Sequence, residues 1–284
     1  MTNLPGVCIL TDSTAQFTVS PFPGQDLVSV IPLRINLNHV NYLDGLGLSI
    51  YDLPLTARDG KSAQAHAPKP EEFRRAFLSL GEEHQEILAI LLSARLSSAI
   101  ANAHQAAGTL PGRISLTILD SQTTGVGLGL LVQAAAEAAQ DGATVKEIKQ
   151  LVRHLVAHIY TVFYVQSLSY LSLGGHIDPA QAVVGEMLGV TPIILLENGR
   201  LVPVQKARSS RHLLDLLVEF LGEFGKLKHI SLLKGTLPFE SEIHHLRQRI
   251  NDLFPATTFS EHALGTGLAT ILGPCSLGLM VMEG

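Results

Sequence analysis

The chain has 284 residues, of which 46% are hydrophobic and 16% are charged, and its formal net charge at pH 7 is −5. This length predicts one large domain or two modest ones, and the apolar content is too high for a disordered chain. This negative net charge and the absence of any cluster of lysine and arginine argue against a protein that binds nucleic acid.

The first half of the chain alternates short apolar runs with segments of helical periodicity, which is typical of parallel α/β structure. Strands are predicted at residues 7–10, 28–33, 87–92 and 114–119, and helices from Pro70, from Ser97 to Gly108, up to about Gly142 and after Thr144. The last of these helices begins with a capping box, because Glu147 follows Thr144 by three residues. We therefore expect a Rossmann-like domain with a parallel sheet over residues 1–158.

After residue 158 the pattern changes to a mixture of strands and helices. Strands are predicted at 160–165, 192–196, 201–204, 227–233, near 256–260 and at 277–282, and helices from Asp178, over 209–224 and over 239–253. The dipeptide Asn198-Gly199 between two of these strands predicts a tight hairpin turn. We expect an α+β domain over residues 159–284, in close contact with the first domain.

Three predicted strands each end in a loop rich in hydroxyl groups, at residues 11–14, 93–98 and 120–124. In an open parallel sheet, ligands bind beyond the carboxyl ends of the strands, so we expect these loops to meet at one edge. Helix N-termini at this edge offer free N–H groups, which suit an anionic head group. Two interpretations stay open: a ligand-binding edge, or side chains that only cap helices.

The common catalytic motifs are absent, including the G-x-S-x-G elbow, the Walker A loop and H-E-x-x-H. The glycines of residues 125–129 lack the spacing of a dinucleotide fingerprint, and we interpret them as sites of close helix packing. His154 and His158 share a helix face, but without a neighbouring carboxylate they indicate a surface pair. We therefore expect no catalytic residue and no metal site. The competing interpretation is a metal-dependent phosphotransferase or hydrolase that uses Asp12 and Asp120.

The two cysteines, Cys8 and Cys275, are too few for a disulfide scaffold or a cysteine-based zinc site, which favours a reducing compartment. The first residues lack the basic and apolar regions of a signal peptide. Apolar runs such as 87–92 are far shorter than the ~18 residues of a membrane span. The sequence therefore predicts a cytoplasmic protein without a membrane span, and we expect a monomer.

With these segments laid out, the sequence resembles the DegV family of bacterial fatty-acid-binding proteins over nearly its whole length. The matching segments, in the family's order, are Thr11-Asp12-Ser13, Pro32-Leu33, Tyr42-Leu43-Asp44-Gly45, Leu96-Ser97-Ser98, Asp120-Ser121, residues 171–177, Gly199, Lys206-Ala207-Arg208, Gly273-Pro274 and Leu277-Gly278. The resemblance implies a two-domain α/β protein that encloses one long-chain fatty acid, such as palmitate, in a tunnel between its domains. It also implies a lipid-binding protein that is not an enzyme and has no cofactor. Several members resemble the acyl-carrying subunit of a fatty-acid kinase, which presents the carboxylate to a separate ATP-dependent subunit.

The resemblance further implies which residues bind the fatty acid. These positions are Ser13, Ala65, His66, Ser93, Ser97, Ser98, Ser121, Gly174, Gly175 and His176. Ser97 lies at a helix start in the matched motif, so it is expected to hold the head group. Arg208 matches a basic position that faces the kinase subunit.

The sequence departs from the family's pattern at several of these positions. An ungapped alignment sets residues 65–68, Ala-His-Ala-Pro, where the family has Thr-Ser-Gln-Pro, whereas a gapped alternative sets residues 62–64 there. His176, Thr191 and Ile271 replace an arginine, a lysine and a histidine of the family. These departures bear on the kinase partner more than on the lipid. A lipid-sensing regulator without a kinase partner is therefore the alternative function.

Simple energetics support a fatty-acid ligand. Burying some 14 methylenes of a C16 chain at ~0.8 kcal/mol each stabilises the complex by about 11 kcal/mol. Association costs remove roughly half of this or more, which leaves a dissociation constant in the micromolar to nanomolar range. Hydroxyl groups such as that of Ser97 satisfy a carboxyl group without a fixed positive charge, so we expect the acid to be bound neutral or weakly charged. A protonated His66 would instead favour the carboxylate and make retention sensitive to pH. The other interpretation of His66 is an exposed loop histidine.

Overall fold

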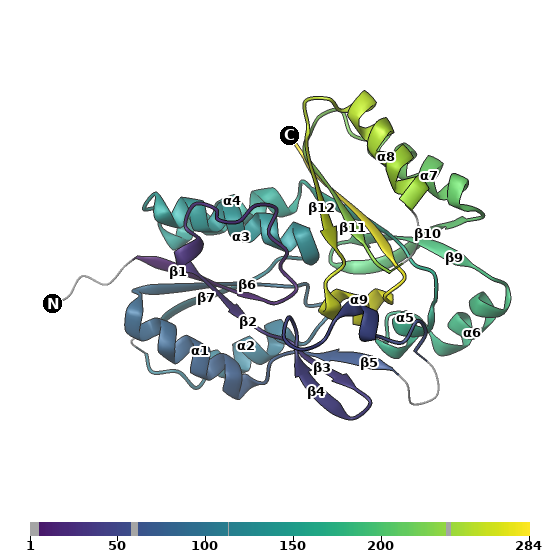
Figure 1. Ribbon diagram of the computed structural model, residues 1–284. Coiled ribbons are helices and arrows are strands. Elements are labelled where there is room, and N and C mark those ends of the chain that lie inside the picture. Colours follow the sequence, from purple (N-terminus) through teal and green to yellow (C-terminus); the bar gives the residue numbers. More distant parts are fainter. Residues whose placement is uncertain (1–5, 58–61, 113, 237–239) are drawn as a thin grey trace. The chain divides into compact units, whose positions relative to one another are not determined.

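The computed structural model describes residues 6–57, 62–112, 114–236 and 240–284, and the chain divides into two compact units (Figure 1). Unit 1 comprises Met1–Ile35, Asn41–Gly47 and Ala65–Ala157, and unit 2 comprises Asn36–Val40, Leu48–Gln64 and His158–Gly284. The α/β class expected from the sequence is confirmed, with a parallel sheet in the N-terminal part and a mixed sheet in the C-terminal part. A domain boundary between residues 158 and 159 stays a prediction.

A four-stranded parallel sheet forms the centre of unit 1, in the order β2-β1-β6-β7. Its strands are β1 (Val7–Asp12), β2 (Val28–Ile31), β6 (Glu86–Leu91) and β7 (Ser115–Asp120). All residues of β1 and all but the first of β6 are buried, as expected for central strands that are covered on both faces. The predicted strand 28–33 is shorter in the structure and ends before Pro32, which has no N–H group to donate to a sheet.

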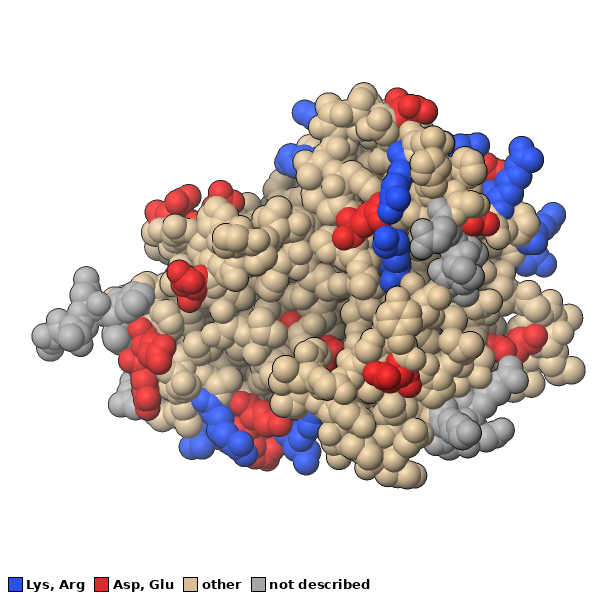
Figure 2. Space-filling view, in the orientation of Figure 1, with Lys and Arg blue, Asp and Glu red and all other residues tan. Residues whose placement is uncertain are grey.

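Two pairs of helices cover the faces of this sheet (Figure 1). They are α1 (Pro70–Glu83) with α2 (Ala99–Ala107), and α3 (Gly125–Gln140) with α4 (Val145–Val156). α1 begins at Pro70 as predicted and buries Phe73 and Phe77, one turn apart. In α4 the predicted capping box is present, since the Thr144 N–H donates to Glu147 Oε2 at 2.8 Å. Basic and acidic side chains lie next to one another over the region of α1 (Figure 2).

A small sheet that the sequence did not predict follows β2. Its strands β3 (Arg34–Leu37), β4 (Val40–Leu43) and β5 (Ala63–His66) have the order β4-β3-β5. Asn38 and His39 join β3 to β4, and both have a positive φ, which suits a two-residue hairpin loop. These strands are only four residues long and carry several polar side chains, so their periodicity is weak. The short 3-10 helix η1 (Gln25–Leu27) precedes β2, and η2 (Ile50–Asp52) lies between β4 and β5 in sequence.

A six-stranded mixed sheet forms the centre of unit 2, in the order β10-β9-β8-β13-β11-β12. Its strands are β8 (Ile159–Tyr164), β9 (Thr191–Glu197), β10 (Arg200–Ala207), β11 (Leu227–Lys234), β12 (Thr258–Ala263) and β13 (Leu277–Glu283). Only β11 and β12 are parallel neighbours. The predicted hairpin is confirmed, since Asn198 and Gly199 join β9 to β10 with φ values of 49° and 77°.

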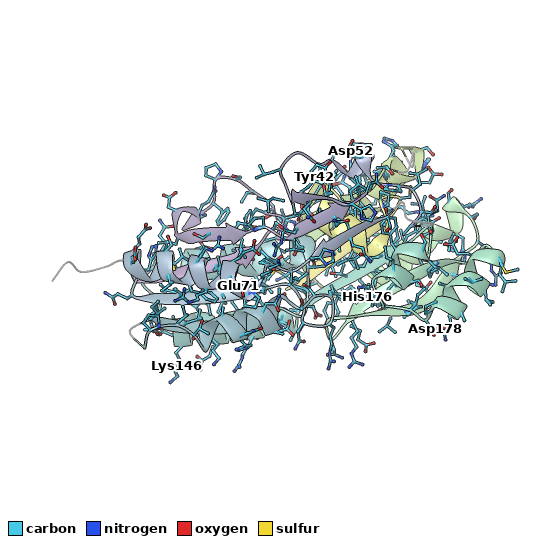
Figure 3. The ribbon with its side chains drawn as sticks, turned by 90° about the horizontal axis from the view of Figure 1, so that it is seen from below. Tyr42, Asp52, Glu71, Lys146, His176 and Asp178 are labelled. Atoms are coloured by element: carbon cyan, nitrogen blue, oxygen red, sulfur yellow. The ribbon has the colours of Figure 1, made fainter. Side chains whose placement is uncertain are left out.

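The helices of unit 2 are α5 (Ser169–Leu173), α6 (Pro179–Met187), α7 (Ser210–Gly222), α8 (Glu240–Leu253) and α9 (Thr266–Leu272). A buried cluster joins side chains of α7 and α8 to those of β11 and β13, including Leu217, Leu246 and Ile230. The carboxylate of Asp178 (Figure 3) caps α6 by accepting from the N–H groups of Ala180 and Gln181. Among the described residues, no helix combines the length and the apolar character needed to cross a bilayer.

The glycine-rich start of α3 is a place of close packing, as predicted. A Cβ atom added at Gly129 would lie 1.9 Å from the backbone oxygen of Gln16, which is far inside van der Waals contact. The segment that follows β1 therefore passes directly over this helix, and the Gln16 N–H donates to the oxygen of Gly125 at 3.0 Å. Only a residue without a side chain fits at position 129.

We predict that Gly129→Ala destabilises the protein by about 2 kcal/mol or more, because the added methyl group forces backbone apart. Within a free helix the same change stabilises by roughly 0.5–1 kcal/mol. Gly222→Ala in α7 is the matched control, since nothing lies within 4 Å of a Cβ atom there. Thermal unfolding should show a lower melting temperature for Gly129→Ala only; equal melting temperatures would contradict the packing argument.

Candidate functional site

The three hydroxyl-rich loops of unit 1 meet at the carboxyl edge of its parallel sheet, as expected from the sequence. The N–H of Leu92, which follows β6, donates to Asp12 Oδ2 at 2.7 Å, and Asp12 ends β1. The Ser93 N–H donates to the oxygen of Thr123 at 2.9 Å, and the Ala94 N–H donates to Asp120 Oδ1 at 3.2 Å. Backbone hydrogen bonds thus join the loop after each strand to its neighbour.

Asp12 is fully buried at the centre of this edge. Its Oδ1 accepts from the N–H (3.0 Å) and the hydroxyl (2.6 Å) of Thr14, while Oδ2 accepts from Leu92. Burial raises the pKa of Asp12 above its ordinary value, and these three hydrogen bonds oppose the rise because they favour the carboxylate. Both oxygens are therefore occupied in holding the loops together.

Three of the predicted serines are also engaged within the loops. The Ser13 hydroxyl donates to Asp44 Oδ2 at 2.7 Å and accepts from the Leu33 N–H at 3.0 Å. The buried Ser121 hydroxyl donates to the oxygen of Thr123, and the Ser93 hydroxyl accepts from the N–H of Arg95. These hydroxyl groups shape the edge of the sheet, and none of the three residues lines the pocket beside it.

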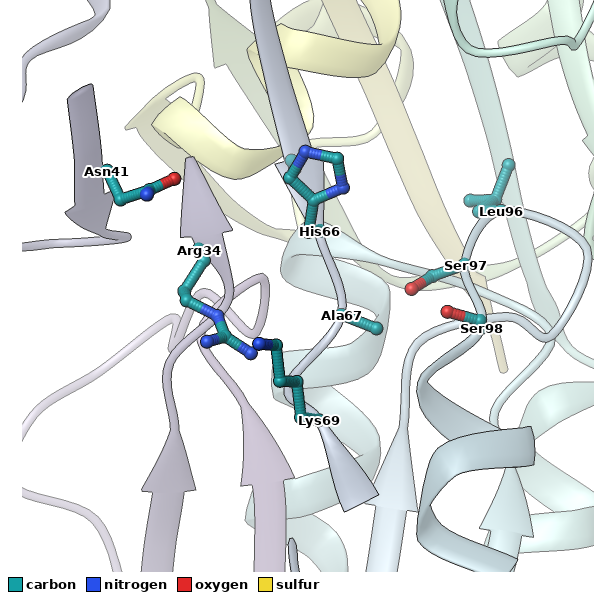
Figure 4. Close-up of a pocket in the computed structure, with 9 residues that line it drawn as sticks. Arg34, Asn41, His66, Ala67, Lys69, Leu96, Ser97 and Ser98 are labelled. Atoms are coloured by element: carbon teal, nitrogen blue, oxygen red, sulfur yellow. The ribbon is translucent and has the colours of Figure 1, made fainter. Parts of the chain in front are cut away.

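A pocket of about 540 Å³ lies in unit 1 beside this edge (Figure 4). Four of its lining residues are predicted ligand-binding residues: Ala65, His66, Ser97 and Ser98. Five more were not predicted: Arg34, Asn41, Ala67, Lys69 and Leu96. The structure therefore brings the end of β5 together with the loop before α2. The ungapped alignment of residues 65–68 is consistent with this arrangement, because Ala65 and His66 line the pocket with Ser97.

The loop before α2 places two hydroxyl groups on one wall of the pocket. Ser98, rather than the predicted Ser97, precedes the first residue of the helix, and its side chain makes no capping hydrogen bond. The Ser97 hydroxyl accepts weakly from the Ala99 N–H at 3.3 Å. The helix begins later than predicted because Ser97 still belongs to the preceding turn, in which its N–H donates to the oxygen of Ser93. Figure 4 shows both hydroxyl groups directed toward the chain segment at Ala67.

The facing wall carries the positive charges of the pocket. Arg34 begins β3 and donates to Glu72 Oε2 at 2.7 Å, while Lys69 precedes α1. Glu72 also accepts from the backbone N–H of Lys69 at 2.7 Å. Within the part of the chain that the structure describes, no aspartate or glutamate lines the pocket. This wall suits an anionic group.

Sequence reasoning missed Arg34, Asn41 and Lys69 because no motif connects them. Arg34 and Asn41 come from the unpredicted small sheet, and Lys69 immediately precedes the helix predicted to begin at Pro70. Asn102 holds the two walls in register, since its Nδ2 donates to the oxygen of Pro68 at 2.8 Å. The geometry arises from pairing between segments that are distant in sequence.

The remaining predicted residues belong to unit 2. Gly174 follows α5, Gly175 has a φ of 72°, and the His176 N–H donates to the oxygen of Leu171 at 2.8 Å. A Cβ atom at Gly174 would lie 2.8 Å from the His176 ring, so this ring packs over the glycine. Burial lowers the pKa of His176 below its ordinary value, which favours a neutral ring. Arg208 is exposed and follows β10.

Within the described ranges, no group of three or more histidine, cysteine, aspartate or glutamate side chains is arranged to hold a metal ion. Asp120 resembles Asp12 in being engaged by backbone donors, since its Oδ1 accepts from the N–H groups of Ala94 and Gln122. Both aspartates predicted as alternative catalytic groups therefore have structural partners.

The fold and the pocket define the class of protein. It is a two-unit α/β protein, with a parallel sheet and a polar pocket in one unit and a mixed sheet in the other. The chain belongs to the DegV family, because the family model described as "Uncharacterised protein, DegV family" matches residues 7–284. A DegV domain-containing protein of Deinococcus radiodurans is 28% identical over 96% of this chain and 97% of its own.

Solved structures show the same fold. A DegV family protein from Thermus thermophilus, whose structure is described as showing fatty-acid binding, is 26% identical with a TM-score of 0.83 over 98% of this chain and all of its own. The Streptococcus pneumoniae Fatty Acid Kinase (Fak) B3 protein, loaded with linoleic acid, has a TM-score of 0.84 at 19% identity, covering 98% of this chain and 100% of its own.

We predict that Asp12→Asn destabilises the protein by about 2–4 kcal/mol, because an amide nitrogen would face buried N–H and hydroxyl donors. Asp26→Asn is the matched control, since Asp26 is exposed in the same unit. Urea unfolding should show a lower midpoint for Asp12→Asn alone. A midpoint equal to that of the control would mean that the carboxylate does not hold the edge of the sheet.

Proposed function

We propose that this protein binds a long-chain fatty acid and holds its carboxyl group in the pocket of unit 1. The observation that carries the proposal is that four residues from two distant segments, Ala65, His66, Ser97 and Ser98, line one pocket. The Thermus thermophilus relative, described as binding fatty acid, supports the class of ligand. Palmitate is the representative ligand, and burial of its acyl chain supplies the apolar part of the binding energy.

In this proposal the protein binds and presents its ligand without catalysing a reaction. Ser97 offers its hydroxyl group as a hydrogen-bond partner of the carboxyl group rather than as a nucleophile. Among the hydrogen bonds of the described residues, none joins Ser97 to His66, so the pair lacks the arrangement of an activated serine. The tail supplies most of the affinity through apolar burial, and the pocket fixes the position of the head group.

The proposed partner is a separate ATP-dependent kinase subunit that receives the presented carboxylate. The Streptococcus pneumoniae protein named as part of a fatty acid kinase supports this partner through its shared fold. Arg208 is exposed after β10, where a partner can reach it. His176 in place of the family's arginine favours the second candidate, a lipid-sensing regulator that binds fatty acid without a kinase.

Organic extraction of the purified protein, followed by mass spectrometry, tests the ligand. We expect fatty acids of about 14–18 carbons in roughly stoichiometric amount, because such chains bury enough apolar surface for tight retention. Protein that has been stripped of lipid should take up palmitate again. If no fatty acid is extracted and stripped protein takes up none, the proposed function is wrong.

We predict that Ser97→Ala weakens fatty-acid retention about threefold to tenfold, while Ser121→Ala has a smaller effect, because only Ser97 lines the pocket. Native mass spectrometry of the two variants measures the bound fraction during dilution. Circular dichroism melting checks that both variants fold, since the Ser121 hydroxyl is bonded within its loop. Equal retention in folded variants would refute the role of Ser97.

We predict that Arg208→Glu preserves the bound fatty acid but reduces ATP-dependent phosphorylation of the carboxylate at least about tenfold, because a docking cation becomes repulsive. A fatty-acid kinase catalytic subunit with ATP forms the product, and hydroxylamine traps it as a hydroxamate. Arg200→Glu is the control, since Arg200 is exposed at the start of β10, the strand that Arg208 follows, and undergoes the same charge change. Loss of bound lipid in Arg208→Glu would place this residue in the lipid site instead.

A further inference from the structure

The wall of the pocket that faces Ser97 and Ser98 is cationic, which a site built on hydroxyl groups alone does not require. Arg34 and Lys69 both line it, and their side chains reach toward each other in Figure 4. Among the described residues that line the pocket, none is acidic. A group that enters between the two walls therefore meets hydroxyl groups on one side and two positive charges on the other.

One acidic group behind this wall compensates for part of the charge. Glu72 accepts from the Arg34 guanidinium and from the Lys69 N–H through the same oxygen, Oε2, at 2.7 Å in both cases. This arrangement fixes the end of the Arg34 side chain, of which 23% is exposed. Counting Arg34, Lys69 and Glu72 together, one positive charge is left for a ligand.

Two helices add to the same potential. α1 begins at Pro70, directly after Lys69, and α2 begins at Ala99, directly after Ser98. The N-terminal end of a helix carries partial positive charge, and it acts here in addition to two side-chain cations. The helix ends and the side-chain cations all make the electrostatic potential of the pocket more positive, which favours an anion over a neutral group of the same shape.

In the ungapped alignment, Ala65 stands where the family resemblance implies a hydroxyl group. We infer that this pocket recognises its ligand by charge: Arg34 and Lys69 hold the head group as a carboxylate anion and disfavour neutral lipids such as esters and alcohols. This inference rests on the proposed function and names the ionic form in which the ligand is held. It replaces the expectation, drawn from hydroxyl groups alone, that the acid is bound neutral.

The first experiment compares palmitic acid with methyl palmitate, which has the same tail without the charge. Each competes with a fluorescent long-chain fatty acid for stripped, full-length protein, and the two dissociation constants are compared. We expect the ester to bind at least about tenfold more weakly than the acid, since the ester cannot pair with either cation. Equal affinities for acid and ester would overturn the inference.

The second experiment changes the charges one at a time. Arg34→Gln and Lys69→Gln should each weaken palmitate binding about threefold to fivefold and leave methyl palmitate unchanged, because the pair is partly exposed to water. Glu72→Gln should act in the opposite direction and tighten palmitate binding, because it removes the compensating charge while an amide oxygen still accepts from Arg34 and Lys69. This reversal of sign cannot arise from misfolding.

Lys146→Gln is the control for net charge. Lys146 is exposed on α4 of the same unit and points away from the ribbon in Figure 3, and it does not line the pocket. It should change neither affinity. If palmitate and its ester bind wild-type protein equally and the variants change nothing, charge recognition is wrong while fatty-acid binding stands. If neither compound binds, the proposed function fails and this inference fails with it.

Discussion

A single buried carboxylate organises the part of the molecule on which the site depends. Asp12 accepts three hydrogen bonds at the end of β1, and one of them comes from the Leu92 backbone at the end of β6. That contact sets where the following loop leaves the sheet, and this loop carries Ser97 and Ser98 to the wall of the pocket. Burying a carboxylate is costly unless its oxygens are paired, and here both oxygens of Asp12 accept hydrogen bonds.

In the proposed function, recognition of the fatty acid is divided between two physical effects. An acyl chain gains its free energy from leaving water, which is roughly proportional to buried area and carries no directional information. A head group contributes less affinity but selects orientation, through hydroxyl groups on one wall and through Arg34 and Lys69 on the other. Because Glu72 pairs with Arg34, the strength of this selection depends on a balance of nearby charges rather than on one residue.

In the proposed function, the head group of the lipid and the kinase partner are assigned to residues in different units. Ser97 and its neighbours lie in unit 1, whereas Arg208 and His176 lie in unit 2. We therefore expect fatty-acid binding to persist in a member of the DegV family whose partner differs, because we assign the departures at His176 and Thr191 to the partner.

The sequence alone determined the α/β class, most of the helices and strands, the Asn198-Gly199 turn and the meeting of three loops at one sheet edge. Each of these follows from local periodicity or from the common direction of parallel strands. Only the tertiary structure decided that Arg34 and Lys69 join Ser97 in one pocket, while Ser13, Ser93 and Ser121 are engaged within the loops. The reason is that the surroundings of a side chain depend on which distant segments lie together, here β5 and the loop before α2. Such tertiary proximity leaves no periodic signal in the sequence.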